Sequence, residues 1–519
     1  MTLYDNLEFF PLPFRSTKLL ELFLPPACNA LVASAIVDLV MPSGKQTTLV
    51  VENDYVDKDQ ADTYARLQAH SHRDYPRRCY RLHFFDASVF GRHVTAADLQ
   101  SRAVEGALNK AYLGFCVLSP TTPQTIGRTV LRHPSVGGHF ILGKDEYPVN
   151  LMGVSLRVEG TPFMEQDRLS SVCATASMWV ATSALARKSG LALVSPAQLT
   201  GEMLGYVPPG GWSVPIVTGA TTGPTTRQII RLLGAHGYCP VVYEPSANSG
   251  DEPKETIYKY VESGIPVVVT FKTNRGWHAV TIIGHAYDTD ATPTTVGLGG
   301  TKFYRSSQWV PYFIAHDDQS GPYRKLVVAD RTVSIERCTS KYPRKPHLTG
   351  RLGAIIACVP PGILLSGHEA EFKMISLLRD LGKEVFPKGL PDDLVLRTFV
   401  VASNDFKRSF DGERAMSCTP GVTPLAVCYR GTTFSRHVWV MEIATLAHRS
   451  SIPPEGIKII GEIAVDAKAI DRAPDFEALH LPGRYYRMRP DQQFSQSVVD
   501  DWLPVGGGAY PAFRSAEEL

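Results

Sequence analysis

The order of predicted elements between residues 172 and 329 constrains the fold more than any other feature of this chain. Three helix-like stretches come first, and four strand-like runs follow: helices at 172–188, 225–233 and 254–262, strands at 265–271, 279–287, 309–315 and 325–329. Consecutive strands usually pair as antiparallel neighbours, whereas parallel strands need a crossover between them. The pattern therefore predicts an α+β domain in which helices cover an antiparallel sheet.

The length of the chain predicts more than one domain. It has 519 residues, whereas a single hydrophobic core stops growing at about 250–300 residues. A Pro-Pro-Gly segment at 360–362 precedes a predicted helix at 369–381 and suggests a linker. We expect an α+β domain at 1–150, a central domain at 151–365 and an α+β domain at 366–519. The two flanking domains should provide substrate recognition or control access to the central one.

Three further segments carry local expectations. Residues 98–111 read as one helix between the strands predicted at 80–85 and 112–118. Residues 288–301 look like an inserted loop, with a glycine-rich stretch at 296–300 that no helix follows. Without that helix the stretch lacks the context of a phosphate-binding loop. The tail after residue 489 is rich in Gly, Pro and polar residues and should be irregular.

Charge and cysteine content limit the function classes. The 53 basic and 51 acidic residues leave a net charge of +2, so we expect neither a nucleic-acid partner nor a membrane surface. The apolar stretch at 19–41 is broken by charged residues and prolines, which favours core packing over a membrane span. No signal-like segment opens the sequence, and its nine cysteines are widely spaced. These features predict reduced thiols in a cytoplasmic protein.

Cys173 is the strongest candidate for a chemical role. It lies where the first central helix is predicted to begin, and small residues follow it. A helix N-terminus carries partial positive charge that favours a thiolate, so a cysteine there can become a nucleophile. A cysteine on an apolar helix is nevertheless more often a core residue, and the interpretation depends on its partners.

Two later segments supply candidate partners for this thiol. His278 follows the turn Asn274-Arg275-Gly276 at the start of a predicted strand, where we expect it to be half exposed. Asp317 and Asp318 close another predicted strand, and a carboxylate there could hold the histidine ring in one tautomer. The alternative for this pair is an ordinary turn, for which Asp-Asp-Gln-Ser-Gly-Pro is suitable.

Taken in order, these segments resemble the papain-like cysteine peptidases, within the bacterial branch of double-glycine leader peptidases that process bacteriocins. The resemblance covers about residues 165–330 and rests on these motifs: Cys173, Gly264-Ile265-Pro266, His278-Ala279-Val280 with Gly284, and Asp317 with Gly321. It implies a papain-like domain, in which a helix bearing the cysteine packs on an antiparallel sheet bearing histidine and aspartate. It also implies Cys173 as nucleophile, His278 as general base and acid, and Asp317 as the orienting carboxylate.

The chain departs from the family at two positions that matter for chemistry. The family places a glutamine that helps form the oxyanion hole six residues before the cysteine, whereas Gln166 lies seven residues before Cys173. A one-residue bulge would bring Gln166 to that role; otherwise a backbone N–H must act. The family's proline after the aspartate is missing, which leaves Asp318 as a rival to Asp317.

The sequence thus predicts an intracellular cysteine hydrolase that cuts a peptide or isopeptide bond in a peptide or protein substrate, without a cofactor. One alternative is an acyltransferase or transglutaminase-like enzyme with the same triad, and another is an inactive papain-like binding module. A zinc site formed by His70, His72, Cys79 and His83 is disfavoured, because their spacing matches no common structural site. We therefore expect no metal ligands. The sequence gives no indication of the oligomeric state.

Overall fold

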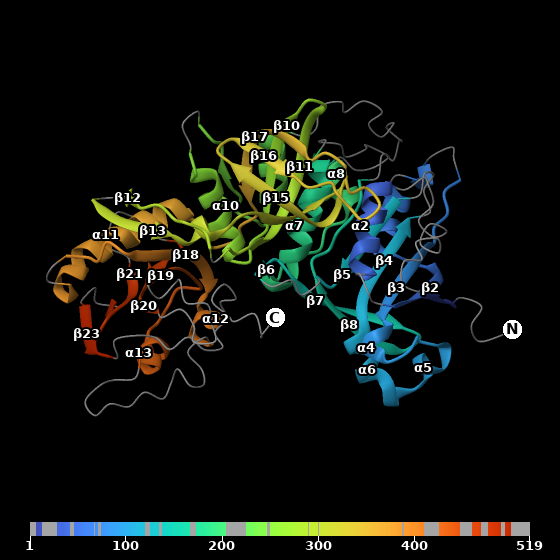
Figure 1. Cartoon of the computed structure of the whole chain (residues 1–519), viewed down its shortest axis with the longest axis horizontal. Coiled ribbons are helices and arrows are strands. Elements are labelled where there is room, and N and C mark those ends of the chain that lie inside the picture. Colours follow the sequence, from blue (N-terminus) through green and yellow to red (C-terminus); the bar gives the residue numbers. More distant parts are fainter. Residues whose placement is uncertain are drawn as a thin grey trace.

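The computed structural model describes most of the chain and shows an α+β protein (Figure 1). The described residues are 7–12, 29–41, 46–66, 68–70, 74–119, 125–133, 138–166, 173–203, 225–246, 250–288, 290–298, 300–386, 389–408, 425–446, 459–468, 476–488 and 494–499. Three large sheets follow one another along the long axis of the molecule, from the N-terminal part on the right of Figure 1 to the C-terminal part on the left. The division into domains at residues 150 and 365 stays a prediction.

The N-terminal sheet is an antiparallel meander of five strands in sequence order. They are β1 (Leu7–Leu12), β2 (Thr47–Tyr55), β3 (Cys79–Asp86), β4 (Tyr112–Ser119) and β5 (Thr125–Leu131). Successive residues of β2 point to opposite faces of the sheet, so Leu49 packs in one buried cluster and Val50 in another. The helix α2 (Ala30–Val40) covers the first of these clusters, and a ribbon of β7 (Asp145–Leu151) and β8 (Val154–Gly160) borders the second.

The single helix expected at residues 98–111 is broken. The chain forms α3 (Lys58–Arg66) and α4 (Ala87–Phe90) and then two pieces where one was expected, α5 (Ala96–Gln100) and α6 (Glu105–Ala111), joined by a 3-10 turn at Arg102–Val104. A capping box between Thr95 and Asp98 starts α5, and Ser101 is extended, with φ −97° and ψ 110°. An extended residue cannot continue a helix, so the apolar pattern alone gave the wrong length.

The central sheet is antiparallel and carries the strands predicted from the sequence. Its members are β6 (His139–Ile141), β9 (Val241–Tyr243), β10 (Val267–Thr273), β11 (Gly276–Ala286), β14 (Phe313–Asp317), β15 (Gly321–Ala329), β16 (Thr332–Ile335) and β17 (Leu348–Ala357). β17 pairs back with β10, so the six strands β10, β11, β14, β15, β16 and β17 close on themselves. Residues of all three predicted helices precede this ring in the chain, as expected.

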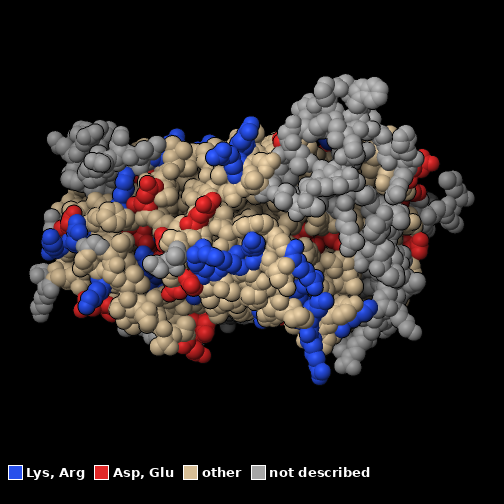
Figure 2. All heavy atoms as spheres, turned by 90° about the horizontal axis from the view of Figure 1, so that it is seen from above, with Lys and Arg blue, Asp and Glu red and all other residues tan. Residues whose placement is uncertain are grey.

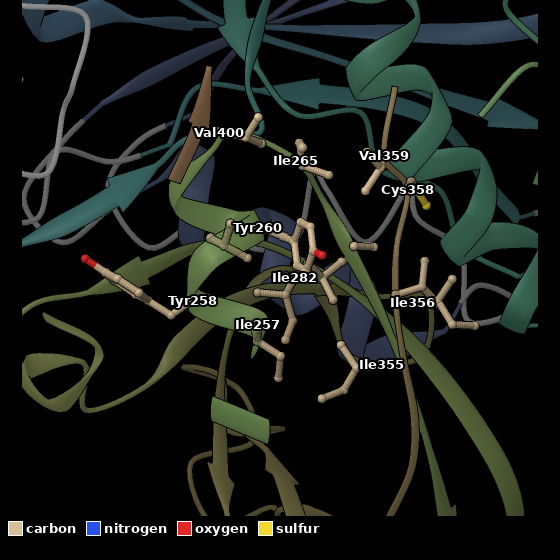
Figure 3. Close-up of a cluster of buried hydrophobic side chains, with 14 of the residues drawn as sticks. Ile257, Tyr258, Tyr260, Ile265, Ile282, Ile355, Ile356, Cys358, Val359 and Val400 are labelled. Carbon is tan, nitrogen blue, oxygen red and sulfur yellow. The ribbon is translucent and has the colours of Figure 1, made fainter. Parts of the chain in front are cut away.

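Four helices accompany the central sheet. They are α7 (Cys173–Ser189), α8 (Pro196–Met203), α9 (Thr226–Ala235) and α10 (Glu252–Glu262). α7 packs on β11 and α10 on β11 and β18. Side chains of α10, β11 and the end of β17 gather in one buried cluster, in which Figure 3 shows Ile257, Tyr260, Ile282 and Ile355. The same cluster contains Ala174, Ala176 and Met178, so the first turns of α7 also pack in it.

The C-terminal sheet contains eight strands in the order β12, β13, β18, β19, β20, β21, β22, β23. Their bounds are β12 (Val296–Leu298), β13 (Thr301–Arg305), β18 (Leu394–Ala402), β19 (His437–Thr445), β20 (Ile459–Asp466), β21 (Phe476–Leu481), β22 (Arg484–Met488) and β23 (Phe494–Val498). Neighbours are antiparallel except β13 and β18, which are parallel. The helices α11 (Gly367–Val385), α12 (Ser403–Arg408) and α13 (Leu425–Gly431) lie around this sheet.

Two of the loop expectations are corrected by this sheet. Within the glycine-rich stretch, Val296–Leu298 forms β12 and pairs antiparallel with β13, and Gly300 just before β13 adopts a φ of 83° that glycine favours. The region after residue 489 is not wholly irregular, since Phe494–Val498 forms β23 and pairs with β22. In both cases cross-strand hydrogen bonds, which local composition does not reveal, decide the structure.

Two surface properties bear on the partner predictions. None of the helices that the structure describes is both long and apolar enough to cross a membrane. Basic and acidic side chains both occur across the face in Figure 2, in keeping with a near-zero net charge.

Candidate active site

Cys173 is the first residue of α7 and lies at the edge of a buried helix. Residues 174–186 of α7 are all buried, whereas Cys173 itself is half buried. The Thr281 hydroxyl of β11 donates a hydrogen bond of 2.7 Å to the Ser177 carbonyl, which ties the first turns of α7 to the sheet. The thiol is therefore held at a helix start, with one side open to solvent. The residues just before it, 167–172, lie outside the described part of the chain.

His278 lies on β11 opposite Phe271 of β10, two residues after the turn that joins the strands. Its side chain is only 4% exposed, so the expectation of a half-exposed ring was wrong. The Phe271 ring meets the imidazole edge-on, at 5.4 Å between centroids and 84° between planes. This packing and the turn after β14 bury the ring, and neither contact is visible in the local sequence.

Asp317 is the carboxylate that bonds to His278. Its Oδ1 lies 2.8 Å from Nε2 of His278, whereas Oδ1 of Asp318 lies 3.8 Å from the same nitrogen. The Gln319 backbone N–H donates to the same Asp317 oxygen at 3.1 Å. The geometry thus favours Asp317 over Asp318 as the partner of the histidine.

The two buried aspartates titrate in opposite directions. Burial alone would raise the pKa of Asp317, but the adjacent His278 holds it at about 2. Burial raises the pKa of Asp318 well above its usual range, and the neighbouring Asp317 raises it further. Two carboxylates this close in a dry site cannot both ionise easily, so one is charged and the other neutral. The two shifts favour Asp317 as the charged member and Asp318 as the neutral one.

The thiol of Cys173 lies beside the ring of His278, close enough to act on its pKa. Burial would lower the pKa of His278, but the Asp317 carboxylate and the neighbouring Cys173 raise it well above 6.5. Because Nε2 faces Asp317, Nδ1 is the nitrogen left for the thiol. The side-chain amide of Gln319 lies at this same nitrogen, with its Nε2 at 3.4 Å from Nδ1. The ring therefore links a carboxylate on one side to a half-buried thiol on the other.

Gln166 follows a segment that is anchored close to these carboxylates. The Glu165 side chain accepts hydrogen bonds from the backbone N–H groups of Asn29 and Ile126, at 3.1 and 3.0 Å. Glu165 also lies near enough to Asp318 to raise the pKa of that carboxyl group, after burial and Asp317. Gln166 itself is half buried, and its proposed oxyanion role stays a prediction.

Two residues that sequence reasoning missed complete the surroundings of the ring. Asn29 caps α2 through its side-chain oxygen and donates from Nδ2 to the Gln319 carbonyl at 2.9 Å. Gln319 was read only as part of a turn. An asparagine directly before the apolar run at 30–40 is a recognisable N-cap signal, but nothing in it indicates a contact with residue 319.

The disfavoured zinc set does not form a cluster among the described residues. His83 is buried between the Tyr112 hydroxyl at 2.9 Å and the Glu52 carboxylate at 3.3 Å, and burial lowers its pKa to about 4. His72 lies outside the described part. Within that part, the group of three or more ligand-type side chains whose atoms all come within 4.8 Å of one another is His278, Asp317 and Asp318. Its histidine nitrogen already bonds to Asp317, so the group is a histidine–carboxylate pair with a second carboxyl group beside it.

What this arrangement can do chemically is nucleophilic attack by a thiol, with proton transfer through an imidazole that a carboxylate orients. Comparison with known proteins found no matching family model, curated protein or solved structure, so the site must be interpreted from its own geometry.

Proposed function

We propose that this chain is a cysteine hydrolase with a papain-like central domain, which cleaves a peptide or isopeptide bond. The observation that carries the proposal is the grouping of Cys173, His278 and Asp317, in which Asp317 bonds to the ring at 2.8 Å and Cys173 lies beside it. A half-buried thiol, a buried imidazole and an ionised carboxylate form the set that acyl transfer through a thioester requires.

The arrangement of elements supports the papain-like part of the proposal. The cysteine begins a helix that packs on β11, and β11 and the adjacent β14 bear the histidine and the aspartate. The helix dipole favours negative charge at the sulfur, and Asp317 favours positive charge on the ring. Both fields act in the direction that makes the thiol a nucleophile.

In the proposed reaction, the Cys173 sulfur attacks the carbonyl carbon while His278 holds the thiol proton on Nδ1. His278 returns that proton to the leaving amine as the carbon–nitrogen bond breaks, which leaves a thioester. Water then attacks the thioester with His278 as the base, and the free thiol is restored. Asp317 stays ionised throughout, fixes the ring tautomer and stabilises the imidazolium.

Labelling by a thiol-directed acyl or epoxide probe tests this proposal. The Cys173→Ala variant should lose labelling, because the activated sulfur is removed. Cys239→Ala is the matched control, since Cys239 is also a half-buried free thiol but lies outside the site. Labelling of Cys173→Ala at the rate of the unmodified protein would show that another cysteine reacts, and the proposal would fail.

Product analysis separates the hydrolase from the acyltransferase alternative. With a thioester formed on Cys173, water gives a free acid, whereas an added primary amine gives an amide if the site accepts it. We expect the acid to be the main product in millimolar amine. A predominant amide product would shift the assignment to acyl transfer on the same triad.

A further inference from the structure

Gln319 is held at three points around the histidine. Its backbone N–H donates to Oδ1 of Asp317 at 3.1 Å, and its carbonyl accepts from Nδ2 of Asn29 at 2.9 Å. Its side-chain Nε2 lies 3.4 Å from Nδ1 of His278. A turn residue with backbone and side chain both fixed in this way presents its amide in a defined place.

That place is at the ring nitrogen that serves the nucleophile, and Gln319 is only half buried. Nδ1 of His278 is the nitrogen that serves the thiol, so the Gln319 amide and the Cys173 sulfur share one end of the ring. Cys173 and Gln319 are both half buried, whereas His278, Asp317 and Asp318 are buried. Cys173 and Gln319 are thus the residues of this group that keep some surface exposed.

The chemistry of the proposed reaction needs a hydrogen-bond donor at this end of the ring. When the sulfur bonds to the carbonyl carbon, the electron pair of the carbon–oxygen double bond moves to the oxygen, which becomes an anion. Donors fixed in advance toward that oxygen contribute much of the rate enhancement in acyl transfer. Gln166 was the sequence candidate, but its spacing is irregular and residues 167–172 are not described.

Protonation of the ring frees the Gln319 amide for this task. While Nδ1 is unprotonated, it can accept a hydrogen bond from the Gln319 side chain. Once Nδ1 carries the thiol proton it is no longer an acceptor, and the amide hydrogens can turn to another oxygen. The raised pKa of His278 favours this protonated ring before the attack, so the amide is available when the oxyanion forms.

We propose that the side-chain amide of Gln319 donates a hydrogen bond to the oxyanion, and that Asn29 of the N-terminal part positions it. This inference rests on the proposed cysteine hydrolase function and deepens it. It makes Gln319 a catalytic residue, because its amide contacts a reacting atom, and Asn29 a positioning residue that acts through the Gln319 carbonyl.

Two reactions of Cys173 separate an oxyanion donor from a structural residue. Acylation by p-nitrophenyl acetate passes through a tetrahedral oxyanion, whereas alkylation by iodoacetamide is a direct displacement that forms none. We expect Gln319→Ala to slow acylation by about 10²–10³-fold, the usual effect of removing one oxyanion donor. Gln319→Glu should slow it at least as much, because a carboxylate cannot donate to the oxygen and repels its charge. Alkylation of Gln319→Ala should stay within about threefold of the unmodified protein.

The controls and contrary outcomes are defined on the same two reactions. Gln198→Ala is the matched control, since the Gln198 side chain bonds to Glu202 on the surface of α8, and both of its rates should be unchanged. Equal losses of acylation and alkylation in Gln319→Ala, or no loss in either, would overturn the inference. A loss of acylation alone in Gln166→Ala, with Gln319→Ala unaffected, would assign the donor to Gln166 instead. If p-nitrophenyl acetate does not acylate Cys173 in the unmodified protein, the proposed function itself falls and this inference with it.

Discussion

Strand β11 carries two buried histidines that each bond to a carboxylate, and in our proposal only one of them serves a nucleophile. Nε2 of His278 lies 2.8 Å from Asp317, and Nε2 of His285 lies 2.6 Å from Glu262. Both rings are almost fully buried. The histidine–carboxylate bond alone therefore does not distinguish the site at His278 from the site at His285.

The second ring nitrogen makes the difference. Nδ1 of His285 faces the Ala286 carbonyl oxygen at 3.1 Å, so both of its nitrogens meet oxygen acceptors. Nδ1 of His278 instead faces the side with the Cys173 thiol and the Gln319 amide. A ring whose two nitrogens both face acceptors has no nitrogen available for a thiol, whereas a ring nitrogen that faces a thiol can take its proton and return it.

The carboxylates of Glu262 and Asp317 also have different neighbouring side chains. Arg397 donates to Glu262 at 2.6 Å and to Glu442 at 2.6 Å, inside a fully buried network. Despite burial, Arg397 and His285 hold the pKa of Glu262 at about 2. Asp317 has the imidazole as its cationic partner and a neutral carboxyl group beside it. A histidine–carboxylate pair therefore becomes a catalytic candidate when its free nitrogen meets an accessible nucleophile.

The largest expected effect comes from removing the ring that serves the thiol. His278→Ala should slow the alkylation of Cys173 by iodoacetamide at pH 7 by about 10³-fold, because the thiol loses its base. The comparison residue gives the control: in folded His285→Ala protein the rate should be close to that of the unmodified protein. Rates are followed by mass spectrometry of the intact protein. Equal losses in the two variants would erase the distinction drawn between the two histidines.

The second effect is a loss of folding stability, and it concerns the network around His285 and Glu262. Arg397→Met leaves the buried carboxylates of Glu262 and Glu442 without their cation, and removing one partner of a buried pair costs about 3–5 kcal/mol. Urea denaturation should show this loss, while alkylation of Cys173 in the folded variant is unchanged. If stability is unaffected, the network around His285 is not the structural element described.

A third prediction concerns pH and separates the two aspartates. Asp317→Asn removes the charge that favours the imidazolium, so the acid limb of the alkylation profile should move to higher pH. We expect the rate at pH 6 to fall by about 10–100-fold, in line with a loss of one to two pKa units of ring stabilisation. Asp318→Asn replaces a carboxyl group that is already neutral, so its profile should match that of the unmodified protein. The reverse result would make Asp318 the third member of the triad.

The smallest effect tests the contribution of the N-terminal part. Asn29→Ser keeps an oxygen that can cap α2 but removes the donor to the Gln319 carbonyl. Acylation by p-nitrophenyl acetate should slow by about three- to tenfold, the value of one hydrogen bond. Alkylation and thermal stability should be nearly unchanged. A large fall in stability without a change in acylation would make Asn29 a helix cap and nothing more.

The elements of the central sheet could be predicted because their signals are local. The helix from Cys173 and the strands that carry His278 and Asp317 each follow from apolar periodicity within a few residues of the observed bounds. The break at Ser101 could not be predicted in the same way, because it depends on a competing cap. Apolar periodicity averaged over a stretch of sequence does not show where a helix is interrupted by such a cap.

The detail of the candidate site depends on contacts between distant segments. The burial of His278 comes from Phe271 and from the turn at 317–319, not from its neighbours in the chain. Asn29 and Gln319 are 290 residues apart in sequence. A single sequence gives no signal for such a pair, so the residue types of the triad could be predicted while its supporting residues could not.

Acylation of Cys173 by p-nitrophenyl acetate tests the central claim most directly. In time-resolved mass spectrometry at pH 7, the unmodified protein should gain one acetyl group on Cys173 and then lose it to water, and His278→Ala should gain none on the same timescale. An acetyl group on another residue, or equal acetylation of Cys173 in both proteins, would contradict a triad of Cys173, His278 and Asp317.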